Sequence, residues 1–167
     1  MSTHELTQTP TSDTARRERL LGWIGLLARL VLGGVLIAAG ALKVGHPVTS
    51  KMAVQAYQIF PYELAGWIGL ALPFAEIVLG TLLVLGLFTR VSAALATGLM
   101  ILFVLGIASA WARGLNIDCG CFGGGGQIGA GQTAYPQEIA RDLALVACGA
   151  LLIRHPRTAL ALDSRLV

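Results

Sequence analysis

The chain has 167 residues, enough for one domain, and its composition is that of a membrane protein. Apolar residues make up 55% of it and charged residues only 13%, whereas a soluble domain carries about 25% charged residues. A chain so poor in charge lacks the polar surface that a water-soluble fold needs. The net charge of +3 does not indicate nucleic-acid binding, and three cysteines exclude a disulfide-rich scaffold.

The polar segment at residues 1–19 is predicted to be a disordered cytoplasmic tail that ends in a cluster of three arginines, Arg16, Arg17 and Arg19. The apolar run at residues 20–42 is long enough to cross about 30 Å of hydrocarbon. Its basic and small flanking residues also suit a cleaved signal peptide, but the run is too long for one and contains Arg29. We therefore expect a first transmembrane helix here.

Three further apolar runs, at about residues 66–87, 91–111 and 139–153, are predicted to span the membrane. Only Phe88, Thr89 and Arg90 separate the second run from the third, so these two helices should form an antiparallel hairpin. The fourth run is short, and Arg141 near its start is expected to snorkel toward the surface.

Together the runs predict an all-α membrane protein with a four-transmembrane-helix bundle at residues 20–154 and a cytoplasmic C-terminal tail at residues 155–167. Basic residues set the orientation, because Lys and Arg accumulate in cytoplasmic loops. Seven of them flank the spans on the side of the chain ends: Arg16, Arg17, Arg19, Arg90, Arg154, Arg157 and Arg165. Four lie on the other side: Lys43, Lys51, Arg113 and Arg141. The chain is therefore predicted to lie in the plasma membrane with both termini in the cytoplasm.

Two loops then lie outside the cytoplasm. In the first, residues 44–65, Ser50 is expected to cap a short interfacial helix that Pro61 stops. The second, residues 112–138, is the longest stretch without clear periodicity and contains Cys119, Gly120 and Cys121. Such a long irregular loop in a compact domain is usually functional or disordered.

The two outer cysteines favour a redox pair. Cysteines two positions apart can bring their Cα atoms within the roughly 4.4–6.8 Å that a disulfide tolerates, and Gly120 supplies the backbone freedom that so small a ring requires. The ring would be strained, and strained, exposed disulfides exchange readily. The outer face of a bacterial-type membrane is also a compartment in which disulfides persist.

Other interpretations of the pair stay open, including inert thiols and metal handling. A closed zinc site needs four ligands, and only His46 offers an obvious third, so no metal site is predicted, although copper(I) binding by two thiolates is not excluded. Arg113 or Arg141 can stabilise a thiolate, whereas Asp118 opposes one. Cys148 lies about 13 Å down the fourth predicted helix and is expected to be a packing residue.

Two charged residues fall near the middle of predicted spans, Arg29 in the first and Glu76 in the second. Such charges are costly in a bilayer and must face the bundle. Small residues at helical spacing, such as Gly33 and Gly80, allow these two antiparallel helices to pack closely, and we expect Arg29 to pair with Glu76. A structural role and a functional role both stay open for this pair. Asp142, beside Arg141, suits the positive N-terminus of the fourth helix.

These residues resemble the MauE branch of the DoxX-like membrane proteins. The resemblance covers about residues 20–153 and rests on four motifs: Arg29 with Gly33 and the Ala39-Gly40-Ala41-Leu42-Lys43 string, Leu72-Pro73-Phe74-Ala75-Glu76 with Gly80, Asp118-Cys119-Gly120-Cys121-Phe122-Gly123, and Arg141-Asp142. It implies a four-helix membrane protein linked to thiol redox chemistry outside the cytoplasm. The family is associated with the maturation of methylamine dehydrogenase, and relatives with thioredoxin-fold partners or quinone-coupled oxidation.

The leading hypothesis is a membrane thiol–disulfide redox protein in which Cys119 and Cys121 exchange electrons with a soluble thioredoxin-fold partner outside the cytoplasm. A quinone held near Arg29, Lys43 and Glu76 is one candidate for the membrane carrier. Supporting roles are predicted for four neighbours of the pair: Asp118, Gly120, Arg141 and Asp142. The alternatives are a non-enzymatic assembly factor and a small transporter, which would need to oligomerise.

Overall fold

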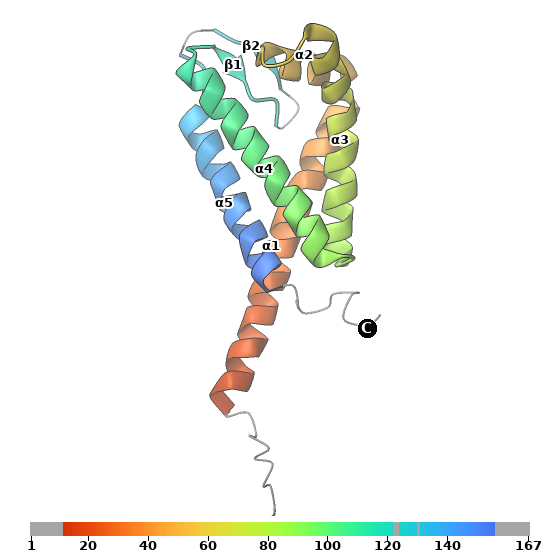
Figure 1. The fold of residues 1–167 in the computed structure, drawn as a ribbon, viewed down its shortest axis with the longest axis vertical. Coiled ribbons are helices and arrows are strands. Elements are labelled where there is room, and N and C mark those ends of the chain that lie inside the picture. Colours follow the sequence, from red (N-terminus) through yellow and green to blue (C-terminus); the bar gives the residue numbers. More distant parts are fainter. Residues whose placement is uncertain (1–11, 122–123, 130, 156–167) are drawn as a thin grey trace, which may run out of the picture.

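The computed structural model describes residues 12–121, 124–129 and 131–155, so the outer parts of both predicted tails, residues 1–11 and 156–167, lie outside it. The described chain is mostly helical. Its four long helices, which run side by side, are α1 (Ser12–Val44), α3 (Tyr62–Leu85), α4 (Thr89–Ala112) and α5 (Tyr135–Arg154) (Figure 1). A short helix, α2 (Pro47–Ala56), and an antiparallel hairpin of β1 (Ile117–Asp118) and β2 (Gly126–Gln127) cover one end of the bundle, the hairpin end (Figure 1).

Among the described residues, three helices are long and apolar enough to cross a membrane: α1 from Arg16 onward, α3 and α4. Their outward faces expose large apolar side chains, among them Leu27, Trp67, Phe74 and Leu102, which suits contact with lipid. The fourth predicted span, α5, is not among the three, because Glu138, Arg141, Asp142 and Arg154 place four charges in its 20 residues. Whether α5 crosses the membrane, and with it the orientation, stays a prediction.

Two predicted boundaries were wrong. Helix α1 begins at Ser12, so residues 12–19 are helical instead of belonging to a disordered tail, and this segment extends beyond the bundle (Figure 1). The α3–α4 connection consists of residues 86–88 and not 88–90, because Gly86 adopts a left-handed conformation (φ 69°) and ends α3 there. The Leu87 N–H then donates to the Leu82 carbonyl at 2.9 Å, which satisfies an orphan acceptor of the last helical turn.

The short helix in the first loop exists, but Ser50 does not cap it. α2 starts at Pro47, which needs no N–H in the first turn, and it ends at Ala56, before Pro61 is reached. Ser50 is buried, and its hydroxyl donates to the carbonyls of Lys43 and His46, both at 3.1 Å. Ser50 therefore ties the start of α2 to the end of α1.

Helices α1 and α3 pack through a seam of small residues, as the glycine spacing predicts. A Cβ atom added at Gly80 would lie 2.6 Å from the carbonyl oxygen of Gly33, and one added at Gly40 would lie 2.6 Å from that of Pro73. Neither approach leaves room for a side chain, so the backbones touch directly. The seam also fixes the register, with Gly33 opposite Gly80 and Gly40 opposite Pro73.

This register shows that the predicted pairing of Arg29 with Glu76 was wrong. Roughly 12 Å of helix rise separates the levels of the two residues, and each side chain leans toward the N-terminus of its own helix, which carries them apart. The same geometry brings Lys43 and Glu76 together, and Lys43 Nζ lies 2.6 Å from Glu76 Oε1. Arg29 is buried nearer the opposite end of the bundle.

Two apolar clusters hold these elements together. The larger lies between the long helices and includes Leu32, Leu83 and Met100, with Cys148 packed against it as predicted. The smaller lies under the hairpin and joins it to α2, α4 and α5: Ala56, Ile107, Ala110, Ile117 and Tyr135. This second cluster attaches the loop that carries Cys119 and Cys121, called the cysteine loop below, to the helices.

Candidate functional site

The cysteine loop starts from an anchored point. Ile117 is buried, and its N–H donates to the hydroxyl of Tyr135 at 3.0 Å. The same hydroxyl donates to the Leu115 carbonyl at 2.5 Å. A buried phenol that both accepts and donates fixes the backbone on either side of Asn116, so the chain enters the cysteine segment in one direction.

Helix α2 lies directly on the loop. Gly120 has φ 72°, and a Cβ atom there would lie 2.6 Å from the Cβ of Ala53, while one at Gly125 would lie 2.4 Å from it. The Gly120 N–H donates to Asp118 Oδ1 at 2.9 Å, which closes a tight turn between the cysteines. Both the turn and the close approach of α2 therefore require glycine at position 120.

The two outer thiols are hydrogen-bonded to each other and are less exposed than predicted. All three cysteines are free thiols, with Cys119 half-buried and Cys121 only 8% exposed. The hydrogen bond with Cys121, together with burial, raises the pKa of Cys119, and the same bond lowers the pKa of Cys121 against the opposing effect of burial. Cys119 is therefore the donor, and Cys121 is the sulfur that ionises first.

Charged groups of α1 and α5 surround Cys121. Arg141 and Lys43 lower its pKa, whereas Asp142 raises it. Arg141 Nε donates to Asp142 Oδ1 at 2.9 Å, so this pair lies beside the thiols. The other candidate cation, Arg113, donates instead to the backbone carbonyls of Tyr57 and Ser109, so it lies at the base of the loop. Of the two arginines considered from the sequence, Arg141 is the one near the sulfur.

Tyr57, at the end of α2, is a site residue that the sequence analysis missed. Its hydroxyl donates to the Cys119 carbonyl at 3.3 Å. Burial raises the pKa of Tyr57 above its usual value, and the neighbouring thiols raise it further. The phenol therefore stays protonated and acts as a donor. Nothing in the local sequence marks it, because 62 positions separate the two residues.

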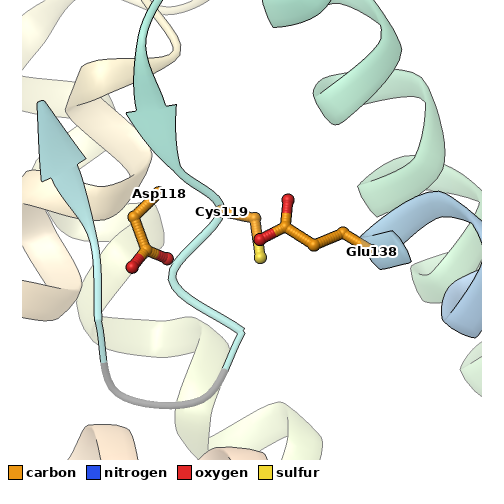
Figure 2. A group of neighbouring side chains, drawn as sticks. All are labelled: Asp118, Cys119 and Glu138. Carbon is orange, nitrogen blue, oxygen red and sulfur yellow. The ribbon is translucent and has the colours of Figure 1, made fainter. Parts of the chain in front are cut away.

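Glu138 is a second residue that the sequence did not indicate. Figure 2 shows its carboxylate directed toward the Cys119 sulfur, with Asp118 on the other side of the loop. One ligand atom from each of the three residues lies within 4.8 Å of the others. Asp118 already accepts the Gly120 N–H, and His46, the third ligand considered from the sequence, bonds the Leu42 carbonyl instead. A closed zinc site needs a fourth ligand, so this cluster does not itself assign a metal.

Below the thiols lies the buried ion pair of Lys43 and Glu76, whose residues are 5% and 0% exposed. Lys43 Nζ also lies 5.5 Å from the centre of the Phe103 ring, a cation–π contact. A cavity of about 40 Å³ is lined by Lys43, Cys119 and Cys121. A second, of about 20 Å³, is lined by Glu76, Cys121 and Asp142. The thiols and the ion pair are thus parts of one site.

Comparison with protein families decides what kind of protein carries this site. The model of the family described as methylamine utilisation protein MauE matches residues 21–155. The chain belongs to the MauE family. Comparisons with curated proteins and with solved structures found no match. Family membership and the three apolar helices make the chain a multi-pass membrane protein linked to methylamine utilisation.

The residues predicted to hold a quinone do not enclose a site for one in this MauE-family structure. Cofactor sites usually measure about 300–1,000 Å³, whereas the cavities beside Lys43 and Glu76 measure about 40 and 20 Å³. Arg29, the third residue of the predicted set, lies at another level of the bundle.

Proposed function

We propose that this MauE-family chain is a thiol–disulfide redox protein that exchanges electrons with a thioredoxin-fold partner outside the cytoplasm. The observation that carries the proposal is the hydrogen-bonded pair of Cys119 and Cys121 with the cations Arg141 and Lys43 beside it. Inert structural thiols need no such stabilisation of one thiolate, whereas exchange chemistry depends on it.

The unequal burial of the two sulfurs suggests different roles. In the oxidised chain, a thiolate of the partner attacks the half-buried Cys119, which is the more accessible sulfur. The S–S bond to Cys121 breaks, its electron pair stays on Cys121 as a thiolate, and a mixed disulfide forms on Cys119. A second partner thiolate then attacks the partner's own sulfur and releases Cys119. Two electrons pass from the partner, which becomes a disulfide, to the chain, whose two released thiolates take up the protons that the partner's thiols gave up.

The surroundings of Cys121 suit a leaving group. Exchange is faster when the departing sulfur has a low pKa, and the pKa of Cys121 is lowered by the Cys119 thiol, Arg141 and Lys43. The hydrogen bond from Tyr57 to the Cys119 carbonyl and the close approach of Gly120 to Ala53 hold the loop against α2. Cys119 is thus the sulfur that a partner thiolate attacks, and Cys121 is the sulfur that leaves as a thiolate.

The proposed orientation places the hairpin end outside the cytoplasm, with both termini inside, as the arginines near the N-terminus predict. α5 then serves as the fourth span. Three of its four charges lie within Glu138–Asp142 at the hairpin end, and the fourth, Arg154, ends the helix. The apolar stretch between them packs into the larger core cluster through Leu145 and Leu152.

The test uses the full chain in membrane vesicles, oxidised and then mixed with a reduced thioredoxin-fold protein that lacks its resolving cysteine. Mass spectrometry should locate a mixed disulfide on Cys119 with Cys121 released. Cys148→Ser is the matched control and should react normally, because Cys148 packs in the core. The Cys119→Ser/Cys121→Ser double variant should form no adduct.

Sidedness is measured with a membrane-impermeant maleimide on intact cells, which should label the reduced pair from outside. The proposal fails if the oxidised chain forms no adduct. It also fails if cells that carry the double cysteine variant use methylamine as well as cells that carry the parent chain do. The second result would identify the chain as an assembly factor that docks a partner without redox chemistry.

A further inference from the structure

Two buried carboxyl groups line one small cavity beside Cys121. Glu76 and Asp142 are 0% and 1% exposed, and in the described structure Glu76 Oε2 and Asp142 Oδ2 have no hydrogen-bond partner. Both residues line the 20 Å³ cavity, and Cys121 lines it as well. Buried polar atoms are nearly always paired, because leaving one unpaired costs about 1–3 kcal/mol. The two oxygens therefore need an explanation.

The two carboxylates are held in the same way by different cations. Lys43 binds Oε1 of Glu76, and Arg141 binds Oδ1 of Asp142, so each group is anchored through one oxygen, while its other oxygen has no hydrogen-bond partner in the described part of the chain. Charge neutralisation uses only the first oxygen of each group. Two carboxyl groups that each keep one unpaired oxygen and line one cavity with Cys121 match proton-carrying groups for that thiol.

The cavity has the size of a single water molecule. One water needs about 10–15 Å³ of such space and two to four polar partners, and the cavity offers about 20 Å³ with Glu76, Asp142 and Cys121 around it. The remaining lining is mostly apolar, with Leu36, Met100, Phe103 and Leu145 among it. A water here would bridge the two unpaired oxygens and contact the sulfur.

We propose that Asp142, Glu76 and one water in this cavity form a proton relay for Cys121. The inference rests on the proposed thiol–disulfide exchange and assigns a role to two carboxylates that the exchange itself does not use. When Cys121 leaves as a thiolate, it takes the proton of the Asp142 carboxyl group, and Asp142 is reprotonated through the water from Glu76. When an oxidised thioredoxin-fold partner re-forms the disulfide by the reverse exchange and takes up the two electrons, the proton returns along the same path. Each passage moves one proton and no electrons.

Titratable and charged groups from several elements surround Cys121. Facing it are Lys43 from α1, Tyr57 from α2, Glu76 from α3, Arg141, Asp142 and Glu138 from α5, and Cys119 from the loop. From α4, the lining side chains are the uncharged Met100 and Phe103.

The first readout is oxidised-minus-reduced infrared difference spectroscopy of the full chain in vesicles. Because the proton that Cys121 gains comes in the end from Glu76, the parent chain should show a carboxylic-acid C=O band of Glu76 that is lost on reduction. Asp142→Asn interrupts the path between Glu76 and Cys121 and should remove this change. Glu138→Gln is the matched control: Glu138 lies on the same helix beside Cys119, and it does not line the cavity. The control should keep the band.

The second readout is the rate of exchange with the reduced thioredoxin-fold protein in H₂O and D₂O. Proton transfer by a positioned group typically contributes about 10²–10⁴-fold, so Asp142→Asn should slow the exchange at least tenfold and abolish its solvent isotope effect. Because Glu76→Gln leaves Lys43 buried without its partner, the Lys43→Met/Glu76→Gln double variant is used for the second carboxylate and should also lose the isotope effect.

The relay is overturned if the infrared band and the isotope effect survive Asp142→Asn while the double cysteine variant still abolishes the exchange. That result would leave the proposed function intact. If the double cysteine variant exchanges as fast as the parent chain, the proposed function fails, and the relay fails with it.

Discussion

Replacing Lys43 by methionine tests whether the buried ion pair holds the bundle together. In the reduced chain, in which Glu76 has given up its proton, the substitution removes the cation that lies 2.6 Å from Glu76 Oε1 and leaves a carboxylate that is 0% exposed without its partner. Removing one member of a buried pair costs about 3–5 kcal/mol, because the remaining charge stays desolvated. Methionine keeps most of the volume of lysine, so the loss reports the charge and not a cavity.

The double variant Lys43→Met/Glu76→Leu should be far less destabilised than Lys43→Met alone, since replacing both ions by apolar groups of similar size is often neutral or stabilising. Unfolding is followed in detergent by denaturant titration. The parent chain, Lys43→Met, Glu76→Leu and the double variant together make a double-mutant cycle. Lys51→Met is the control for the loss of a lysine, because Lys51 is exposed on α2, and it should change the unfolding free energy by no more than about 0.5 kcal/mol. A loss below about 1 kcal/mol for Lys43→Met, or equal losses for the single and double variants, would refute this reasoning.

The remaining predictions concern the seam, the loop and the thiols. Gly80→Val should destabilise the bundle by at least about 1–3 kcal/mol, because a Cβ atom there already lies 2.6 Å from the Gly33 carbonyl, while Gly34→Ala, with nothing within 4 Å, should not destabilise it in the same unfolding assay. Tyr57→Phe removes the 3.3 Å hydrogen bond to the Cys119 carbonyl and should cost about 0.5–1.5 kcal/mol, with faster alkylation of Cys119 as the loop opens. Since its pKa is lowered, Cys121 should become reactive toward iodoacetamide at lower pH than Cys119, whose pKa is raised; peptide mass spectrometry measures both, and the reverse order would contradict the assignment of donor and acceptor.

The sequence alone determined the features that depend on local patterns. Apolar runs of sufficient length identified α1, α3 and α4, since the thickness of a bilayer is matched by helix rise alone. Glycines at helical spacing identified the seam of α1 and α3, because small residues on one face are visible in a single segment. The Cys-Gly-Cys string and its glycine turn were likewise readable from adjacent residues.

Only the tertiary structure decided which distant residues meet. In the register between α1 and α3, Glu76 pairs with Lys43 and not with Arg29. Side chains on antiparallel helices lean toward opposite ends of the bundle, and the levels of Arg29 and Glu76 differ by about two helical turns, which is more than these side chains can span. The packing of α2 over the loop buried Cys121 and brought Tyr57 to Cys119. The first turn of α5 added Glu138, which the sequence did not indicate, and the docking of α5 brought the predicted Asp142 near Cys121. The hydrogen bond of Tyr57 alone joins residues 62 positions apart. Such contacts depend on how the helices dock, which no local spacing encodes.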